Sequence, residues 1–295
     1  MSSMTDGSRI GRAPDHDDPL SIEAVEARVQ REQTRRARHD RVTRVVYPIA
    51  AVIVLLAAWE LGRDMVGLPR FLLPSPTEIL DAMLRNRAML LREAWVTGLE
   101  VVLGFALSVA IGIPLAVAIF QSPLFSKSVY PILVSFQAVP KVAVAPLFIV
   151  WFGFGMLPKV LIAFLIAFFP VVINTVMGLA SIEREKIHLA RSIGLSKFET
   201  FRLIRFPNAL PSIFAGLKIS ITLAVVGAVV GEFVGGNAGL GYTLMLANGS
   251  MDTALLFAAI FALSFLGYAL FWLVELAERL CMPHLDRASL RGETG

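Results

Sequence analysis

Six long apolar runs follow one another along this chain, and they limit its fold more than any other feature. They are Val45–Leu61, Val101–Phe120, Tyr130–Phe152, Val160–Ile182, Ile213–Val234 and Ala254–Val274. The apolar core of a bilayer is about 30 Å thick and needs about 20 apolar residues per helix. With 56% hydrophobic and 17% charged residues, the chain has more apolar surface than a water-soluble fold of this length buries. We therefore expect an all-α polytopic membrane protein with six transmembrane helices over residues 45–282.

The runs differ in how readily each one inserts alone. A centred apolar residue contributes roughly −0.3 to −0.6 kcal/mol to insertion, whereas a centred charge costs about 2.5 to 3.5 kcal/mol. The second, fourth and sixth runs contain no charge. The third and fifth contain prolines or charges, namely Pro131, Pro140, Lys141, Pro146, Lys218 and Glu232. We expect these two runs to depend on protein neighbours.

The distribution of basic residues predicts the orientation. Residues 1–44 are hydrophilic, and a polar helix rich in arginine is expected from residue 21 to residue 44. The segment Glu183–Pro207 carries six basic residues, whereas Gly235–Thr253 carries none. Because cytoplasmic loops are enriched in Lys and Arg, both termini are predicted to be cytoplasmic, including the tail over residues 283–295. The arginines lie beside a membrane segment, so anionic lipid is the expected contact and nucleic acid is not.

The segment between the first two runs departs from this charge rule. It is predicted to lie outside, yet it carries five arginines. We interpret Ser75–Ala94 as an amphipathic helix at the outer surface, with Ser75 as its cap and Pro76 in its first turn.

A polar segment after the fourth run is too polar to span a membrane. A helix is expected over about 183–193 and ends at Gly194, a typical C-terminal glycine. Ser196 and Glu199 have the spacing of a capping box, and they predict a second helix to about Phe206, stopped by Pro207. Its apolar residues, Phe198, Phe201, Leu203 and Ile204, need a hydrophobic partner.

This segment resembles the "EAA" loop of ABC-type importer permeases. Ala190, Gly194, Ile204 and Pro207 match its pattern, whereas His188, Leu189 and Phe206 stand where Glu, Ala and Leu are usual. The resemblance implies that residues 183–207 contain a coupling helix that docks in a groove of an ATP-binding subunit. The His188 departure puts one ion pair with that subunit in question. The implied coupling residues are His188, Ala190, Arg191, Ser192, Gly194, Ser196, Phe198, Phe201, Ile204 and Pro207.

Further strings extend the resemblance to the nitrate, sulfonate and taurine importer permeases over about residues 70–280. They are PSPTEI at Pro74–Ile79, PLFIVWFGFG at Pro146–Gly155, AFFPVVINTVMGL at Ala167–Leu179 and GEFVGGNAGLGYTL at Gly231–Leu244. The resemblance implies a type I importer permease with the MetI-like fold in the inner membrane. It also implies a second copy of the chain, two ATPase subunits and an extracytoplasmic binding protein as partners.

The chain shows no pattern for chemistry of its own. No lysine follows a glycine, so there is no phosphate-binding G-K-[S/T] loop. The four histidines are scattered without metal-ligand spacing. We therefore expect no enzymatic activity and no cofactor in this chain, with ATP and Mg²⁺ bound by the partner ATPase.

Three polar residues in the apolar runs are candidates for the translocation path, because such residues are costly in a membrane. Lys141 either faces a water-filled cavity and attracts an anion, or extends to the inner surface. Glu232 either lines the path or pairs with a helix end near the outer gate, or it is solvated at the interface. Asn174 either contacts solute or joins helices. The glycines from Gly235 to Gly241 are expected to form a tight outside turn.

Two other classes of protein are less well supported. An ion-driven secondary transporter predicts inverted repeats and paired carboxylates at mid-membrane, and neither is visible. A membrane anchor does not need the helix–glycine–helix segment. Within the permease class, the resemblance implies sulfonates, nitrate or pyrimidine-type vitamin precursors as substrates, and Lys141 favours a small anion.

Overall fold

The computed structural model describes residues 46–63, 65 and 72–282, and for Arg184 and Arg191 it describes only the backbone. The predicted basic helix over residues 21–44 and the tail over residues 283–295 lie outside the described residues. The chain divides into two units, one ending at Gly67 and the other beginning at Leu68. Each unit is described by itself.

The described residues of the first unit form an apolar helix, Val46–Arg63, which coincides with the first apolar run. Large apolar side chains are exposed all around it, among them Tyr47, Ile53 and Leu55. Such a helix needs lipid or other helices around its whole circumference.

The second unit is all-α, and its described residues contain no strand, as predicted. Its helices are α2 (Pro76–Arg85), α3 (Arg87–Gln121), α4 (Pro123–Phe136), α5 (Ala145–Phe152), α6 (Met156–Ala180), α7 (Arg184–Ser192), α8 (Lys197–Thr200), α9 (Phe206–Gly235), α10 (Leu240–Gly249) and α11 (Thr253–Cys281). A 3₁₀ turn, η1 (Lys141–Val144), precedes α5, and a π-helical turn, η2 (Phe201–Arg205), joins α8 to α9.

The number of spans agrees with the sequence. Five helices of the described residues are long and apolar enough to cross a membrane, and a sixth span results if α4 is taken together with η1 and α5. This pair is bent by 87°, and the bend includes Pro140, which has no backbone N–H to continue the helix. The third apolar run is therefore divided into two helical parts at this bend.

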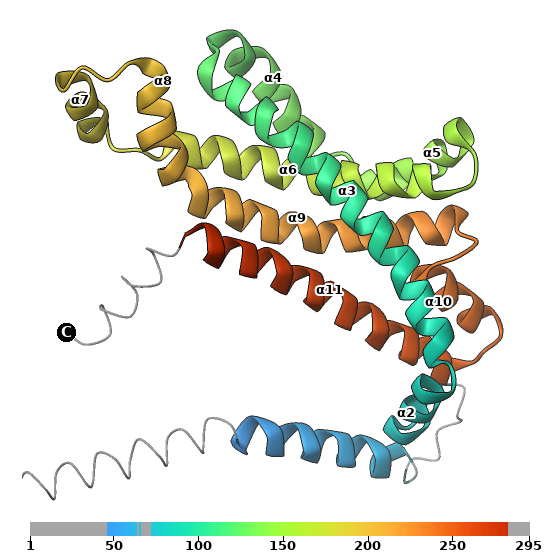
Figure 1. Cartoon of the computed structure of the whole chain (residues 1–295). Helices are drawn as coiled ribbons and strands as arrows, with labels where there is room; N and C mark the ends of the chain where they lie inside the picture. The colour runs from blue at the N-terminus through green and yellow to red at the C-terminus, as the bar shows by residue number, and fades with distance from the viewer. Residues whose placement is uncertain (1–45, 64, 66–71, 283–295) are drawn as a thin grey trace, which may run out of the picture. The chain divides into compact units, whose positions relative to one another are not determined.

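Helices α6 and α9 form the centre of the second unit, and α3 crosses them (Figure 1). They approach closely at Ala163, which is completely buried. A Cβ atom on Gly227 would lie 2.6 Å from the Ala163 Cα atom, and one on Gly104 would lie 2.6 Å from the Ala163 Cβ atom. Small residues at the crossing thus allow the three helices to pack at short distance, as membrane helices commonly do.

The two ends of this unit differ in character (Figure 1). Helices α7 and α8 lie at the end where α6 stops and α9 begins, together with the C-terminal end of α11. Helices α5 and α10 lie towards the opposite end. The polar segment and the short apolar helices therefore occupy opposite ends of the bundle.

The predicted amphipathic helix over Ser75–Ala94 is correct only in its first half. Ser75 caps α2 through a complete capping box with Glu78. Helix α2 then ends at Asn86, whose side-chain amide donates to the Ala82 carbonyl over 2.9 Å. The second half belongs to α3, which begins at Arg87 and continues into the second apolar run.

Candidate functional site

Helices α7 and α8 and the turn between them have the predicted helix–glycine–helix geometry. Gly194 has a φ of +82°, a conformation that costs little only for glycine. The Leu195 N–H donates to the Ala190 carbonyl over 3.0 Å and closes the end of α7. Ala190 itself is buried.

The second helix begins at the predicted cap. The Ser196 N–H donates to the Glu199 carboxylate over 2.8 Å, and the Glu199 N–H donates to the Ser196 hydroxyl over 3.2 Å. This reciprocal pair satisfies two backbone donors that would otherwise lack partners. The direction in which α8 leaves the turn is thereby fixed.

The prediction that Pro207 stops this helix is wrong. The chain continues as one helical segment from Lys197 to Gly235. Proline cannot donate to the carbonyl of residue 203 and clashes with it in a regular helix. The π-helical turn over Phe201–Arg205 accommodates Pro207, because the Phe206 N–H donates to the Phe201 carbonyl, one residue further back than in an α-helix.

The apolar residues of this element fall into two groups. Phe201 packs against the buried cluster of Leu179, Ala209 and Ile213, so it finds its partner within the chain. Phe198 is 71% exposed and Leu203 is 61% exposed.

Helix α7 adds two apolar residues that the sequence analysis did not single out as docking residues. Leu189 is 64% exposed, and Ile193, at the end of α7, is 67% exposed. His188 and Ser192 are exposed, and Ile204 is half-buried. The Arg191 side chain lies outside the described part of the molecule.

Lys141 lies at the bend between α4 and α5. Its ammonium group donates to the Gln137 carbonyl over 3.2 Å and lies 4.8 Å from the centre of the Phe169 ring. The exposed Gln137 and the half-buried Lys141 thus place two polar groups at the bend of this span. Non-helical backbone at membrane depth occurs where it is buried in protein or faces water.

Asn174 lies on α6, where α9 passes closely. Its side-chain amide donates to the Pro170 carbonyl of its own helix over 2.9 Å. A Cβ atom on Gly216 of α9 would lie 2.6 Å from the Asn174 Cβ atom. The residue therefore belongs to the α6–α9 contact.

Glu232 is completely buried rather than solvated at an interface. One carboxylate oxygen accepts from the Thr97 hydroxyl over 2.6 Å, and the other accepts from the Gly241 N–H at the start of α10. A Cβ atom on Gly239 would lie 2.0 Å from the Glu232 carboxylate, so this position requires glycine. Glu232 therefore contacts the N-terminal end of α10, and its role at an outer gate stays a prediction.

Two residues of α3 also accept hydrogen bonds from backbone N–H groups at the start of α10. The Gly239 N–H donates to the Glu93 carboxylate over 2.6 Å, and the Leu240 N–H donates to the Thr97 hydroxyl over 2.8 Å. Three consecutive N–H groups at the start of α10 are thus satisfied by side chains. Helix N-termini favour negatively charged partners in this position.

Lys159 is a buried cation of this network that was not singled out from the sequence. Its side chain is buried, pairs with Glu100 over 2.8 Å and donates to the Ala238 carbonyl over 3.1 Å. Glu100 immediately precedes the second apolar run and lies fully buried within α3. The sequence signal for Lys159 is the need for a cation to balance the carboxylate of Glu232, which lies within an apolar run.

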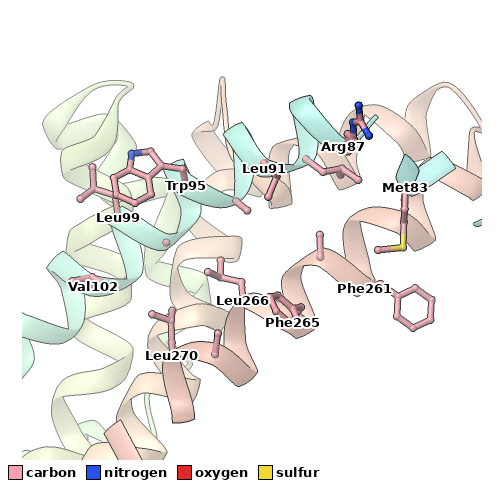
Figure 2. Close-up of a pocket in the computed structure, with 15 residues that line it drawn as sticks. Met83, Arg87, Leu91, Trp95, Leu99, Val102, Phe261, Phe265, Leu266 and Leu270 are labelled. Carbon is pink, nitrogen blue, oxygen red and sulfur yellow. The ribbon is translucent and has the colours of Figure 1, made fainter. Parts of the chain in front are cut away.

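A different feature, an apolar groove of about 880 Å³, runs between α3 and α11. Figure 2 shows Trp95 and Leu99 of α3 on one side and Phe265 and Leu270 of α11 on the other. Arg87 lies at one end, with its guanidinium turned away from α11 (Figure 2). The lining suits hydrocarbon better than a polar solute.

Comparisons with known proteins agree on one family. The family model described as "binding-protein-dependent transport system inner membrane component" matches residues 108–281, more than half of the chain. The formylaminopyrimidine transport permease protein ThiX of Halalkalibacterium halodurans is 36% identical over 237 residues, which are 80% of this chain and 94% of ThiX. The riboflavin transport system permease protein RibX of Chloroflexus aurantiacus is 38% identical over 231 residues, 78% of this chain and 86% of RibX.

More distant similarities point to the same fold. The putative aliphatic sulfonates transport permease protein SsuC of Bacillus subtilis is 29% identical over 264 residues, 88% of this chain and 93% of that protein. A chain of the inward-facing MetNI methionine ABC transporter superposes with a TM-score of 0.57 at 20% identity. The match covers 67% of this chain and 98% of the MetNI chain.

Proposed function

Because the chain belongs to the family of binding-protein-dependent transport system inner membrane components, we propose that it translocates a small solute when a separate ATPase moves α7 and α8. Family membership makes it a permease subunit of a type I ABC importer, a multi-pass inner-membrane protein and not an enzyme. Its cytoplasmic tail would cover residues 1–44, its permease domain residues 45–282 with the coupling loop at 183–207, and its second tail residues 283–295.

The coupling proposal rests on exposed apolar side chains of α7, α8 and the turns beside them, a segment that is otherwise rich in polar residues. Phe198, Leu203, Leu189 and Ile193 are all more than 60% exposed, and they lie on or beside helices rich in charged residues. Exposed apolar side chains on a short helix are typical of docking into a groove of a partner. We propose that this partner is the ATPase subunit, which alone binds ATP and Mg²⁺.

The packing at the opposite side of the element supports transmission of force. Phe201 is anchored in the cluster with Leu179 and Ala209, and the helical segment runs without interruption into α9. The Arg205 guanidinium also lies 4.8 Å from the centre of the Phe120 ring on α3. A displacement of α8 would therefore move α9 and the end of α3.

We place the translocation path along the bend between α4 and α5. The exposed Gln137 and the half-buried Lys141 make this bend unsuited to lipid, and broken helices commonly line transport sites. Helix α5 presents Val150 and Trp151, both strongly exposed, and Phe154 follows it. A second copy of the chain packed on these residues would enclose the path between the two permeases. Asn174 and Glu232 would act in this account through helix packing rather than solute contact.

The substrate class is proposed from the relatives and from Lys141. The relatives at 36% and 38% identity are named for formylaminopyrimidine and riboflavin, which favours a heteroaromatic vitamin or vitamin precursor. Lys141 and the sulfonate permease at 29% identity support a second candidate, a small anion such as a sulfonate or nitrate. An extracytoplasmic binding protein would deliver either one at the end where α5 and α10 lie.

The remaining proposals concern the membrane. We propose that α7, α8 and the C-terminal end of α11 face the cytoplasm, so that both termini are cytoplasmic. The arginine-rich segment before residue 45 would then contact anionic lipid headgroups. Acyl chains would occupy the apolar groove between α3 and α11.

The coupling proposal is tested with Phe198→Asp and, as a matched control, Phe198→Leu. Uptake of labelled pyrimidine and sulfonate solutes is measured with the full-length chain in its native membrane. The ATPase that copurifies with the chain is then measured after purification. We expect Phe198→Asp to lose the ATPase and all uptake, because a charge cannot enter an apolar groove without a large desolvation cost. Phe198→Leu should keep both. Retention of the ATPase and of uptake by Phe198→Asp would contradict the proposal.

A further inference from the structure

The buried cluster formed by Glu100, Lys159 and Glu232 contains one cation and two carboxyl groups. The whole-residue exposure is 0% for Glu100, 2% for Lys159 and 0% for Glu232. In the described part of the chain, Lys159 is the one cation paired with this cluster. With both carboxyl groups ionised, a site that excludes water would hold an uncompensated negative charge, which proteins avoid because its desolvation is costly.

The hydrogen bonds distinguish the two carboxyl groups. Both oxygens of Glu232 accept hydrogen bonds, one from Thr97 and one from the Gly241 N–H. These contacts suit an ionised carboxylate, which is only an acceptor. Glu100 accepts from the Lys159 ammonium with one oxygen, whereas its other oxygen, Oε2, is buried and accepts from no donor in the described residues.

The two carboxyl groups are also neighbours, because Glu100 lies three residues after Thr97 on one side of α3, and Thr97 donates to Glu232 over 2.6 Å. Two neighbouring ionised carboxylates repel and cannot bond, because neither has a hydrogen to donate. One proton converts one of them into a donor. Pairs of this kind titrate as a unit that holds a single proton between them.

We propose that Glu100 and Glu232 share one bound proton, held on the Oε2 atom of Glu100 and donated to the Glu232 carboxylate. The cluster is then neutral, with the Lys159 ammonium balancing the Glu232 carboxylate. The proton fills the one unsatisfied position in the cluster and bonds α3 to α9. The site thus takes a proton as its ligand, and its assignment does not depend on the transported solute.

In the part of the chain that the structure describes, no further cation is paired with Glu100 or Glu232. Helix α3 contributes Glu93, half-buried and bonded to the Gly239 N–H, and helix α6 contributes Lys159. Helix α10 contributes backbone N–H groups rather than a charged side chain. The shared proton therefore belongs to the same network that fixes the α9–α10 turn through Lys159 and the Ala238 carbonyl.

A proton bound in the folded state and absent from the unfolded chain makes stability depend on pH. At neutral pH an unfolded glutamate is ionised, because its ordinary pKa is about 4.3. The folded state then binds one proton more than the unfolded state, so stability falls as pH rises through the neutral range. The loss corresponds to a tenfold change in the folding equilibrium constant per pH unit.

The test compares the full-length wild-type chain with Glu100→Gln, in detergent, over a range of pH. Glutamine keeps an oxygen for Lys159 and supplies an N–H for Glu232, so it reproduces the protonated acid. We expect Glu100→Gln to fold with an unchanged melting temperature near neutral pH. The wild-type melting temperature should fall relative to the variant by about 2–4 °C per pH unit as pH rises.

Infrared spectroscopy supplies an independent readout of the proton. At neutral pH the wild type should show a carboxylic-acid carbonyl band that Glu100→Gln lacks. The control is Glu278→Gln, which alters the half-buried Lys218–Glu278 pair between α9 and α11 and should keep both the band and the pH slope. The proposal would be overturned if the wild type and Glu100→Gln had parallel pH profiles and the same infrared band. Failure of Glu100→Gln to fold would also overturn it.

Discussion

A substitution at Gly194 tests the backbone conformation of the turn between α7 and α8 without changing side-chain contacts. The φ of Gly194 is +82°, and a Cβ atom added there would meet nothing within 4 Å. Any effect of Gly194→Ala therefore comes from the backbone and not from a clash within the chain. A left-handed conformation costs an L-residue roughly 1–2 kcal/mol, which corresponds to a 5- to 30-fold change in a two-state equilibrium.

We expect Gly194→Ala to lower the equilibrium constant for the docking geometry of α7 and α8 by this factor. Gly194→Asn should be much milder, because asparagine tolerates the left-handed region better than other L-residues. The assay is substrate-dependent ATP hydrolysis and uptake by the reconstituted importer, with the melting temperature of the permease as a check on folding. Equal losses in Gly194→Ala and Gly194→Asn would refute the reasoning, since a steric or purely local role would not distinguish them.

Four further variants test other parts of the account. Gly227→Ala should destabilise the chain by about 1–3 kcal/mol because its Cβ atom would meet the Ala163 backbone at 2.6 Å. Gly267→Ala, whose Cβ atom would lie 4.0 Å from Val225, should be neutral or slightly stabilising in the same detergent unfolding assay. Lys159→Met should cost about 3–5 kcal/mol by removing the buried partner of Glu100, and full thermal stability in this variant would contradict the paired geometry. Lys141→Met should leave folding intact and raise the KM for uptake if the solute is an anion, whereas unchanged kinetics would favour a neutral heteroaromatic solute.

The features predicted well from sequence are those that depend on neighbours in the chain. The apolar runs predicted the spans because helix length in a membrane is set by bilayer thickness. The helix caps at Ser75 and Ser196 were predicted because their partners lie three residues away. The left-handed turn at Gly194 follows from the same local reasoning.

Features that depend on distant contacts were missed or misjudged. Glu100 and Lys159 are 59 residues apart, so each residue alone resembles a membrane-boundary charge. Pro207 was expected to end a helix, but the π-helical turn allows the segment to continue. Helix α10 was not predicted, because its N-terminus is fixed by side chains of α3 and α9 that the local sequence does not show.

The central claim is that α7 and α8 contact a separate ATPase, and crosslinking from position 198 tests it most directly. A photoreactive residue is placed at Phe198 in the full-length chain, expressed in its native membrane, and the products are identified by mass spectrometry. The account predicts a product that joins this chain to an ATP-binding cassette protein, lost when the same group is placed at Phe265, which lines the apolar groove. Crosslinks from position 198 only to lipid or to an extracytoplasmic protein would contradict it.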